Sequence, residues 1–185
     1  MPKWGIHRKY ALRFIREKYS VQRDHSYWDN LVNDINLLID FPDKYFSEKD
    51  YAWIKSRIRS NKQRQCMEVA YLISLIHMGF KVIGVVHDWR TIRNNRSPLV
   101  KQVAYCIYGE IGAKLVDLHS ALDRIKQKEY REYKDFIQWA IQNNIDKEIL
   151  YFIKTYWEEI IKDILKEKYT VVKNHEHRSV QRDYF

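Results

Sequence analysis

Residues 97–126 read SPLVKQVAYCIYGEIGAKLVDLHSALDRIK, and this stretch decides the expected fold. Its apolar side chains recur every three or four positions, which is the spacing of one face of an α-helix. Ser97 and Pro98 suit the cap and the first position of a helix, and Gly109 and Gly112 are the points at which it could bend. The apolar face comprises Val103, Ala104, Ile107, Ile111, Leu115, Leu118, Leu122 and Ile125. The stretch predicts one long amphipathic helix, bent at the glycines.

The same helical period recurs on both sides of this stretch. A first helix places His7 in the middle of its apolar face, and a second begins near Ser26 and ends at the turn before Pro42. Residues 63–78 are apolar nearly all round, which is typical of a central helix. Helices are also expected from about residue 47 to 60, at 129–143 and at 146–168. The segment 80–86 has the β-branched content of a strand but no clear partner, so we interpret it as a helix or connector.

These patterns predict an all-α fold. With only 5 glycines and 3 prolines among 185 residues, the chain has few turns. We expect one domain, a bundle of about six or seven helices over residues 1–169, followed by a C-terminal tail at 170–185. Six side chains are predicted to be buried: Phe14, Trp28, Ile73, Ile107, Leu118 and Phe152.

The apolar runs and the two cysteines indicate the expected compartment. No run reaches the roughly 18 apolar residues needed to cross a bilayer, and MPKWGIHRKY lacks the apolar core of a signal peptide. Cys66 and Cys106 lie in apolar surroundings without a CxxC spacing, so we expect buried free thiols. A protein without a membrane span, in the cytoplasm or in a virion, is therefore predicted.

The net charge of +9 is concentrated in the first half of the chain. Residues 1–101 hold 19 Lys and Arg against 10 Asp and Glu, whereas residues 102–185 hold 14 against 14. Two clusters within the first half contain no acidic residue, and aromatic residues lie beside them. They comprise Lys55, Arg57, Arg59, Lys62 and Arg64, and then Arg90, Arg93, Arg96 and Lys101. Guanidinium groups suit phosphate oxygens, so we predict that these residues bind a nucleic-acid backbone; the alternative is a solvated basic face.

His119 and Asp123 are four positions apart, so their side chains are offset by only about 40° around a helix and can meet one cation. His87 and Asp88, inward-facing His7, and Asp40 or Asp43 could supply further ligands. The candidate metal ligands are thus His7, His87, Asp88, His119 and Asp123, and the candidate catalytic residues are the last four of these. The alternative, which we prefer at this stage, is a structural pair in which Asp123 orients a packed and hydrogen-bonded His119 at the rim of the apolar face.

Two families of helical metallophosphoesterases resemble this pattern. The His-x-x-x-Asp of LHSALD, with Trp4 and His7 before it and the FPD sequence between, is similar to zinc-dependent phospholipase C and its nuclease relatives. His87-Asp88 followed by His119 resembles the HD phosphohydrolases. Either resemblance implies a divalent cation, zinc in the first case, and hydrolysis of a phosphoester. Those phospholipases bind metal through the free amine of an N-terminal tryptophan, whereas three residues precede Trp4 here. They also use histidines beyond the aspartate, and no histidine lies between His119 and His175. The resemblance therefore does not imply their full three-metal set.

Two functions from different classes follow from the sequence. The first is a helical binding protein that coats or holds nucleic acid through its backbone and needs no cofactor; it is similar in composition to proteins of archaeal viruses, and it could form a homo-oligomer through its C-terminal helices and tail. The second is a metal-dependent phosphodiesterase or nuclease. An acidic protein partner for the basic face is a further alternative. The sequence favours the binding protein.

Overall fold

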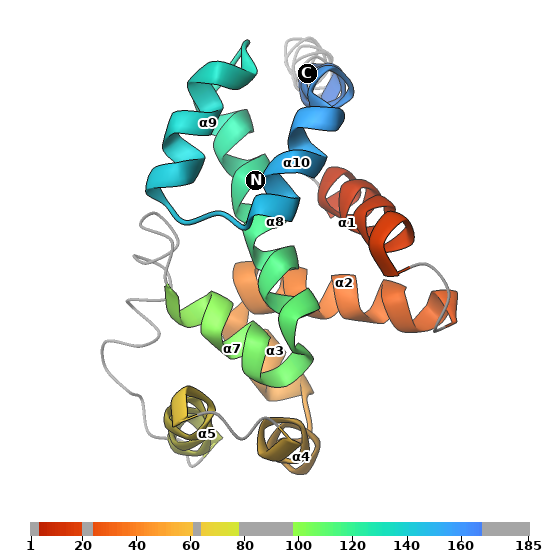
Figure 1. The fold of residues 1–185 in the computed structure, drawn as a ribbon. Helices are drawn as coiled ribbons and strands as arrows, with labels where there is room; N and C mark the ends of the chain where they lie inside the picture. The colour runs from red at the N-terminus through yellow and green to blue at the C-terminus, as the bar shows by residue number, and fades with distance from the viewer. Residues whose placement is uncertain (1–3, 20–23, 61–63, 78–97, 168–185) are drawn as a thin grey trace, which may run out of the picture.

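The computed structural model describes residues 4–19, 24–60, 64–77 and 98–167, and these residues are helical apart from short connections (Figure 1). No strand occurs among them, so the predicted all-α fold is confirmed. The labelled helices are α1 Trp4–Tyr19, α2 His25–Asp40, α3 Pro42–Glu48, α4 Tyr51–Ser60, α5 Arg64–His77, α7 Pro98–Tyr108, α8 Glu110–Lys128, α9 Tyr133–Gln142 and α10 Lys147–Thr155. A further helical segment covers 157–167.

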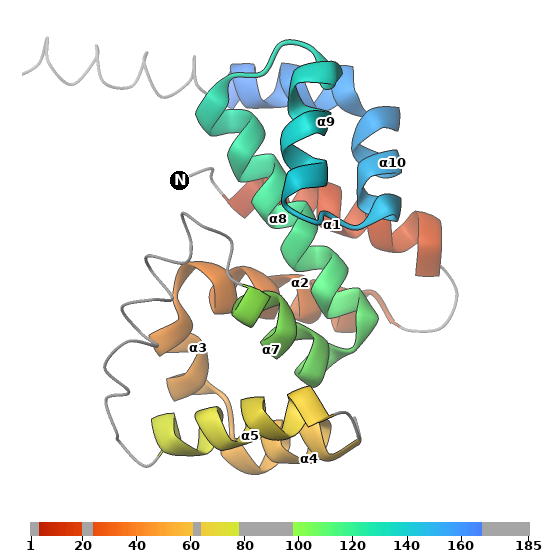
Figure 2. The ribbon, with the colours of Figure 1, turned by 60° about the vertical axis from the view of Figure 1, so that its left-hand side comes forward.

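The predicted long helix over residues 97–126 is in fact two helices, α7 and α8. Gly109 separates them with a φ of +75°, a left-handed conformation that glycine adopts without steric cost. Gly112 lets the helices approach, because a Cβ atom there would lie 2.5 Å from the carbonyl oxygen of Ala104. Figure 2 shows the resulting sharp angle between α7 and α8. The sequence indicated where the helix changes direction, but not that α7 and α8 are separate helices.

The number of helices is larger than the six or seven expected, for similar local reasons. Gly109 divides one predicted helix, and the turn around FPD forms the short helix α3 with Pro42 at its start, where a missing N–H costs nothing. Tyr156 separates α10 from the segment 157–167. The breaks at Gly109 and Tyr156 lie within regions predicted to be helical, whereas α3 occupies a predicted turn.

Helix α8 lies in the middle of the molecule and contacts α1, α2, α7 and α10 (Figures 1 and 2). Five of the six side chains predicted to be buried are so: Phe14, Ile73, Ile107, Leu118 and Phe152. Trp28 is only partly buried, because it lies in the first turn of α2 and packs against Tyr19 and Tyr27 at the edge of the core. The core therefore forms around the helix that carries His119 and Asp123.

Helix α5 is not the central helix that its composition predicted. It lies beside α4 at one end of the molecule (Figure 2), and Met67 and Tyr71 on its outer face are about 70% exposed. Its buried face is joined to α7 by a disulfide between Cys66 and Cys106, so the prediction of free thiols was wrong. The two cysteines are 40 residues apart, and only the packing of α5 on α7 brings their Cα atoms within 5.3 Å.

Several predicted features lie outside the described residues. They are the strand-like segment 80–86, the second basic stretch from Arg90 to Arg96, the pair His87 and Asp88, and the tail at 170–185. Among the helices that the structure describes, none has the length and apolar character required to span a membrane.

Candidate metal site

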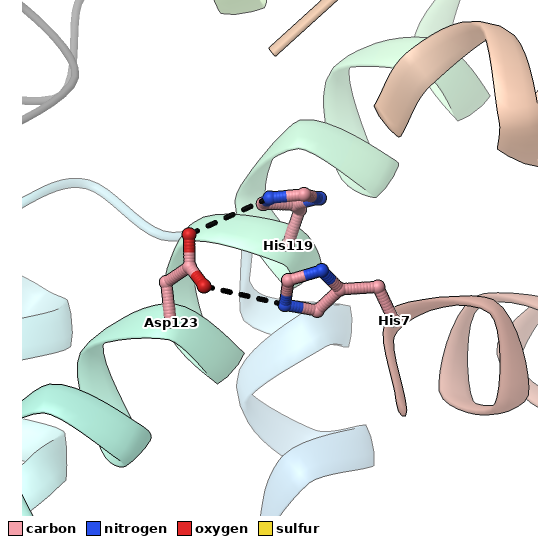
Figure 3. A group of neighbouring side chains, drawn as sticks. All are labelled: His7, His119 and Asp123. Atoms are coloured by element: carbon pink, nitrogen blue, oxygen red, sulfur yellow. Dashed lines mark ion pairs between the residues drawn. The ribbon is translucent and has the colours of Figure 1, made fainter. Parts of the chain in front are cut away.

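Two helices that are distant in the sequence bring three potential metal ligands together (Figure 3). His7 is on α1, and His119 and Asp123 are one turn apart on α8. The Asp123 carboxylate lies between the two imidazole rings and directs one oxygen toward each. Its Oδ1 is 3.4 Å from Nε2 of His7, and its Oδ2 is 3.5 Å from Nε2 of His119. The three side chains thus meet at one point between α1 and α8.

Both histidines are deeply buried, and several of their ring nitrogens lack a hydrogen-bond partner among the described residues. His7 is 2% exposed and His119 is 3% exposed, so the prediction that His119 lies at the rim of the apolar face was wrong. Within the described part of the chain, Nδ1 and Nε2 of His7 and Nε2 of His119 make no hydrogen bond. A buried polar atom without a partner costs about 1–3 kcal/mol. The arrangement therefore carries a free-energy cost at the atoms that a cation would contact.

The two imidazoles lie against each other, with ring centroids 3.8 Å apart and planes inclined by 35°. Burial, with a smaller contribution from the nearby His119, lowers the pKa of His7 to about 4, although Asp123 and Asp40 act in the opposite direction. His7 is consequently neutral at pH 7. A neutral imidazole has one nitrogen with a free lone pair, which is the form that binds a metal.

The Asp123 carboxyl stays ionised well into the acid range. Burial alone would raise its pKa, but the proximity of His119 and His7 more than offsets this and holds the pKa well below its usual value. Its side chain is 18% exposed, which makes it the part of the cluster nearest to solvent. An anionic carboxylate and neutral His7 are in the protonation states that a divalent cation requires.

Helix α2 contributes two polar side chains to the same ring of His119. Asp40 places Oδ1 at 3.9 Å from Nε2, and its side chain is 2% exposed. Asn36, one turn earlier, has its Oδ1 2.9 Å from Nδ1 of His119. His119 thus has the packing and the hydrogen bond that were predicted for a structural role. Asp40 was one of the carboxylates that the sequence offered as a further ligand.

The contacts of Asp123 with the two rings are longer than normal hydrogen bonds. The separations are 3.4 and 3.5 Å, one from each carboxylate oxygen, and exceed the about 2.7–3.2 Å of an N–H···O hydrogen bond. The ligand atoms of His7, His119 and Asp123 all lie within 4.8 Å of one another. The cluster can therefore hold a cation.

The wall behind the histidines is mainly apolar. A small cavity beside the two rings is lined by His7, Ala11, Val32, Ile35, Asn36, Leu115, Leu118 and His119. Asp123, whose side chain is 18% exposed, is not part of this lining.

The residues predicted to bind a nucleic-acid backbone do not share one environment in the structure. Lys55, Arg57 and Arg59 are exposed on α4, and Arg64 is exposed at the start of α5. Lys101 instead makes an ion pair of 2.5 Å with Asp117, whose side chain is buried. Lys62, Arg90, Arg93 and Arg96, like the metal candidates His87 and Asp88, lie outside the described residues.

Sequence reasoning missed Asn36 altogether. The sequence does contain a signal, because Asn36 is the one polar residue in the stretch INLLI, residues 35–39. Its neighbours Ile35, Leu37 and Leu38 are buried. A polar side chain on such a face normally has a specific partner. That partner, His119, is 83 residues away in the sequence.

Comparison with known proteins does not assign this chain to a family. No family model matches it, and neither a curated protein nor a solved structure is significantly similar.

Proposed function

We propose that the protein is a metal-dependent hydrolase that cleaves phosphodiester bonds at the cluster of His7, His119 and Asp123. The observation that carries the proposal is the convergence of these side chains on one point, with ring nitrogens that have no hydrogen-bond partner among the described residues. Asp40 is positioned to supply a second carboxylate. Two imidazoles with carboxylates form a nitrogen and oxygen ligand set that suits zinc.

The chemistry would come from a divalent cation held by His7, His119 and Asp123, with Asp40 nearby. Such a cation would act as a Lewis acid that makes a water molecule more acidic and polarises a phosphoryl oxygen. Attack of the water oxygen on phosphorus would break the bond to the ester oxygen, and the proton lost by the water would balance the proton gained by the departing oxygen. The exposed edge of Asp123 is where the phosphate group would approach.

A phosphate substrate agrees with the charge of the protein. The chain has a net charge of +9, with the whole excess in its first half. An excess of positive charge raises the local concentration of a polyanion and its rate of encounter with the protein. Nucleic acid is therefore the substrate class that we test first.

The first test is metal binding and cleavage by the full chain. After treatment with a chelator, the protein is titrated with zinc, and bound zinc is counted by plasma mass spectrometry. We expect stoichiometric zinc and zinc-dependent hydrolysis of bis(p-nitrophenyl) phosphate and of a labelled single-stranded oligonucleotide. The variant His119→Ala should lose both, because it removes a ligand.

The matched control is His25→Ala, which removes an exposed histidine from the start of α2. It should retain zinc and activity, and circular dichroism checks that both variants fold. Equal zinc binding by the wild type and by His119→Ala would refute the site. A preference for iron(II) with consumption of oxygen would refute hydrolysis, since two histidines and one carboxylate also form the ligand set of iron oxygenases.

A second candidate function is binding of a nucleic-acid backbone by the basic residues of α4 and α5. Lys55, Arg57, Arg59 and Arg64 are exposed there. The Lys55 ammonium lies 5.7 Å from the centre of the Tyr51 ring, and the Arg57 guanidinium lies 5.5 Å from that of Trp53. Basic groups interleaved with aromatic rings are typical of surfaces that track a phosphate backbone. This function needs no metal.

Salt dependence tests the second candidate. The triple variant Lys55→Ala, Arg59→Ala, Arg64→Ala should weaken binding to a DNA duplex. It should also flatten the slope of log affinity against log salt by about 0.9 for each phosphate that is no longer neutralised. The control removes three exposed lysines elsewhere, Lys147, Lys154 and Lys162. Equal slopes for the two triple variants would place the binding surface away from α4 and α5.

A further inference from the structure

We propose that Asn36 is a positioning residue that fixes the tautomer of His119 and so presents the Nε2 lone pair of this ring to the cation. The inference rests on the proposed function for its consequence, zinc affinity. The tautomer itself is a property of the metal-free protein and can be measured separately. Asn36 touches neither substrate nor reacting atoms and acts through His119.

The contact between the two side chains determines which nitrogen carries the proton. Oδ1 of Asn36 is an amide oxygen, which can only accept a hydrogen bond. The atom 2.9 Å away, Nδ1 of His119, must therefore donate. In its neutral form the ring has a single N–H, so with the proton on Nδ1 the other nitrogen, Nε2, has the free lone pair. Nε2 is the nitrogen that faces Asp123 at 3.5 Å.

Helices α2 and α8 hold this arrangement through two pairs with the same spacing. Asn36 and Asp40 are four residues apart on α2, and His119 and Asp123 are four residues apart on α8. Residues at this spacing share one face of a helix. Asn36 thus contacts the Nδ1 edge of the ring, while Asp40 and Asp123 lie near its Nε2 edge.

The energetics of Asn36 favour a role beyond packing. Asn36 is 3% exposed, and its Nδ2 has no hydrogen-bond partner in the part of the chain that the structure describes, so the amide costs free energy where it lies. A leucine would fill the same space between Ile35 and Leu37 without leaving a buried donor unpaired. The contribution that sets Asn36 apart from an apolar side chain is its oxygen at Nδ1 of His119. Hydrogen bonds of this kind orient metal-binding histidines and raise their basicity.

The test compares Asn36→Leu with Asn36→Asp. Leucine removes the acceptor, so zinc affinity should fall about 10- to 100-fold. Aspartate restores an acceptor at the same position, so the affinity should return to at least that of the wild type. Asn33→Leu and Asn33→Asp are the matched controls, because Asn33 is exposed on the same helix. Both controls should bind zinc as the wild type does.

Nitrogen NMR of the metal-free protein gives a result that packing of Asn36 alone would not produce. We expect His119 protonated at Nδ1 in the wild type and in Asn36→Asp, with this preference lost in Asn36→Leu. A wild-type ring protonated at Nε2, or an unchanged tautomer in Asn36→Leu, would overturn the inference. Zinc binding that is unaffected in Asn36→Leu would overturn it too, while the proposed function stands. If the wild type carries the Nδ1 proton and binds no zinc, the proposed function fails and the assignment of the tautomer to Asn36 is supported.

Discussion

Replacing Asp123 by Asn should lower zinc affinity at least about 100-fold and abolish zinc-dependent hydrolysis. Loss of a partner behind a metal ligand typically costs 10- to 100-fold, and loss of a ligand itself should cost no less than the upper end. The Asp123 carboxylate reaches both histidines, at 3.4 and 3.5 Å. Asparagine keeps the shape and removes the negative charge. Zinc titration and cleavage of the phosphodiester substrate measure the effect.

The environment of Asp123 explains why the charge matters more than the shape. Its pKa is held well below the usual value, so the carboxylate is fully ionised at the pH of the assay. In the folded protein His7 is neutral and contributes no charge to the site, because burial lowers its pKa to about 4. Without Asp123, much of the attraction for a divalent cation is lost, and an ion is expensive to desolvate among apolar neighbours.

The control for this prediction is Asp135→Asn. Asp135 is exposed in the first turn of α9, so its loss changes the net charge equally without touching the cluster. It should leave zinc affinity and cleavage unchanged. Zinc bound with wild-type affinity by Asp123→Asn would show that the cation, if any, lies elsewhere.

Removing the disulfide should lower the free energy of unfolding by about 4 kcal/mol. The bond between Cys66 and Cys106 closes a stretch of 40 residues, and the entropy of such a loop in the unfolded chain sets this magnitude. The structural reason for a large effect is that α5 lies at one end of the molecule, where it packs mainly against α4 and α7. Urea unfolding of the double variant Cys66→Ala, Cys106→Ala measures the loss.

Reduction of the wild type provides the matched comparison. A strong reductant should move the wild-type midpoint toward that of the double variant and leave the midpoint of the double variant unchanged. Both cysteines are at most 1% exposed, so reduction should proceed slowly unless the protein is partly unfolded. A fully reduced wild type with the midpoint of the oxidised protein would contradict the prediction.

The sequence alone determined the fold class and much of the core. The helical period of apolar residues identified Phe14, Ile107, Leu118 and Phe152 as buried, because the side of a helix that a residue occupies depends only on its spacing from near neighbours. The same geometry predicted that His7 points inward, as its 2% exposure confirms. Gly109 was one of two glycines at which a bend was predicted, and its positive φ separates α7 from α8 there.

The candidate site was only partly predictable, because spacing in the sequence specifies contacts within one helix but not between helices. His119 and Asp123 could be paired from the sequence because they are neighbours on one helix. That His7 lies beside them depends on α1 packing against α8, which no local spacing specifies. His87 lies outside the described residues. Asp40 was one of several available carboxylates until α2 placed it 3.9 Å from His119.

Tertiary structure alone decided the remaining features. The helical period could not show that Asn36 meets His119, that Cys66 bonds to Cys106, or that Lys101 pairs with Asp117. Each pair joins two helices, and which helices meet is set by how all their apolar faces pack together at once. The sequence therefore determined which face each helix buries, whereas the packing of those faces determined which polar groups share the interior and whether a cation can be held there.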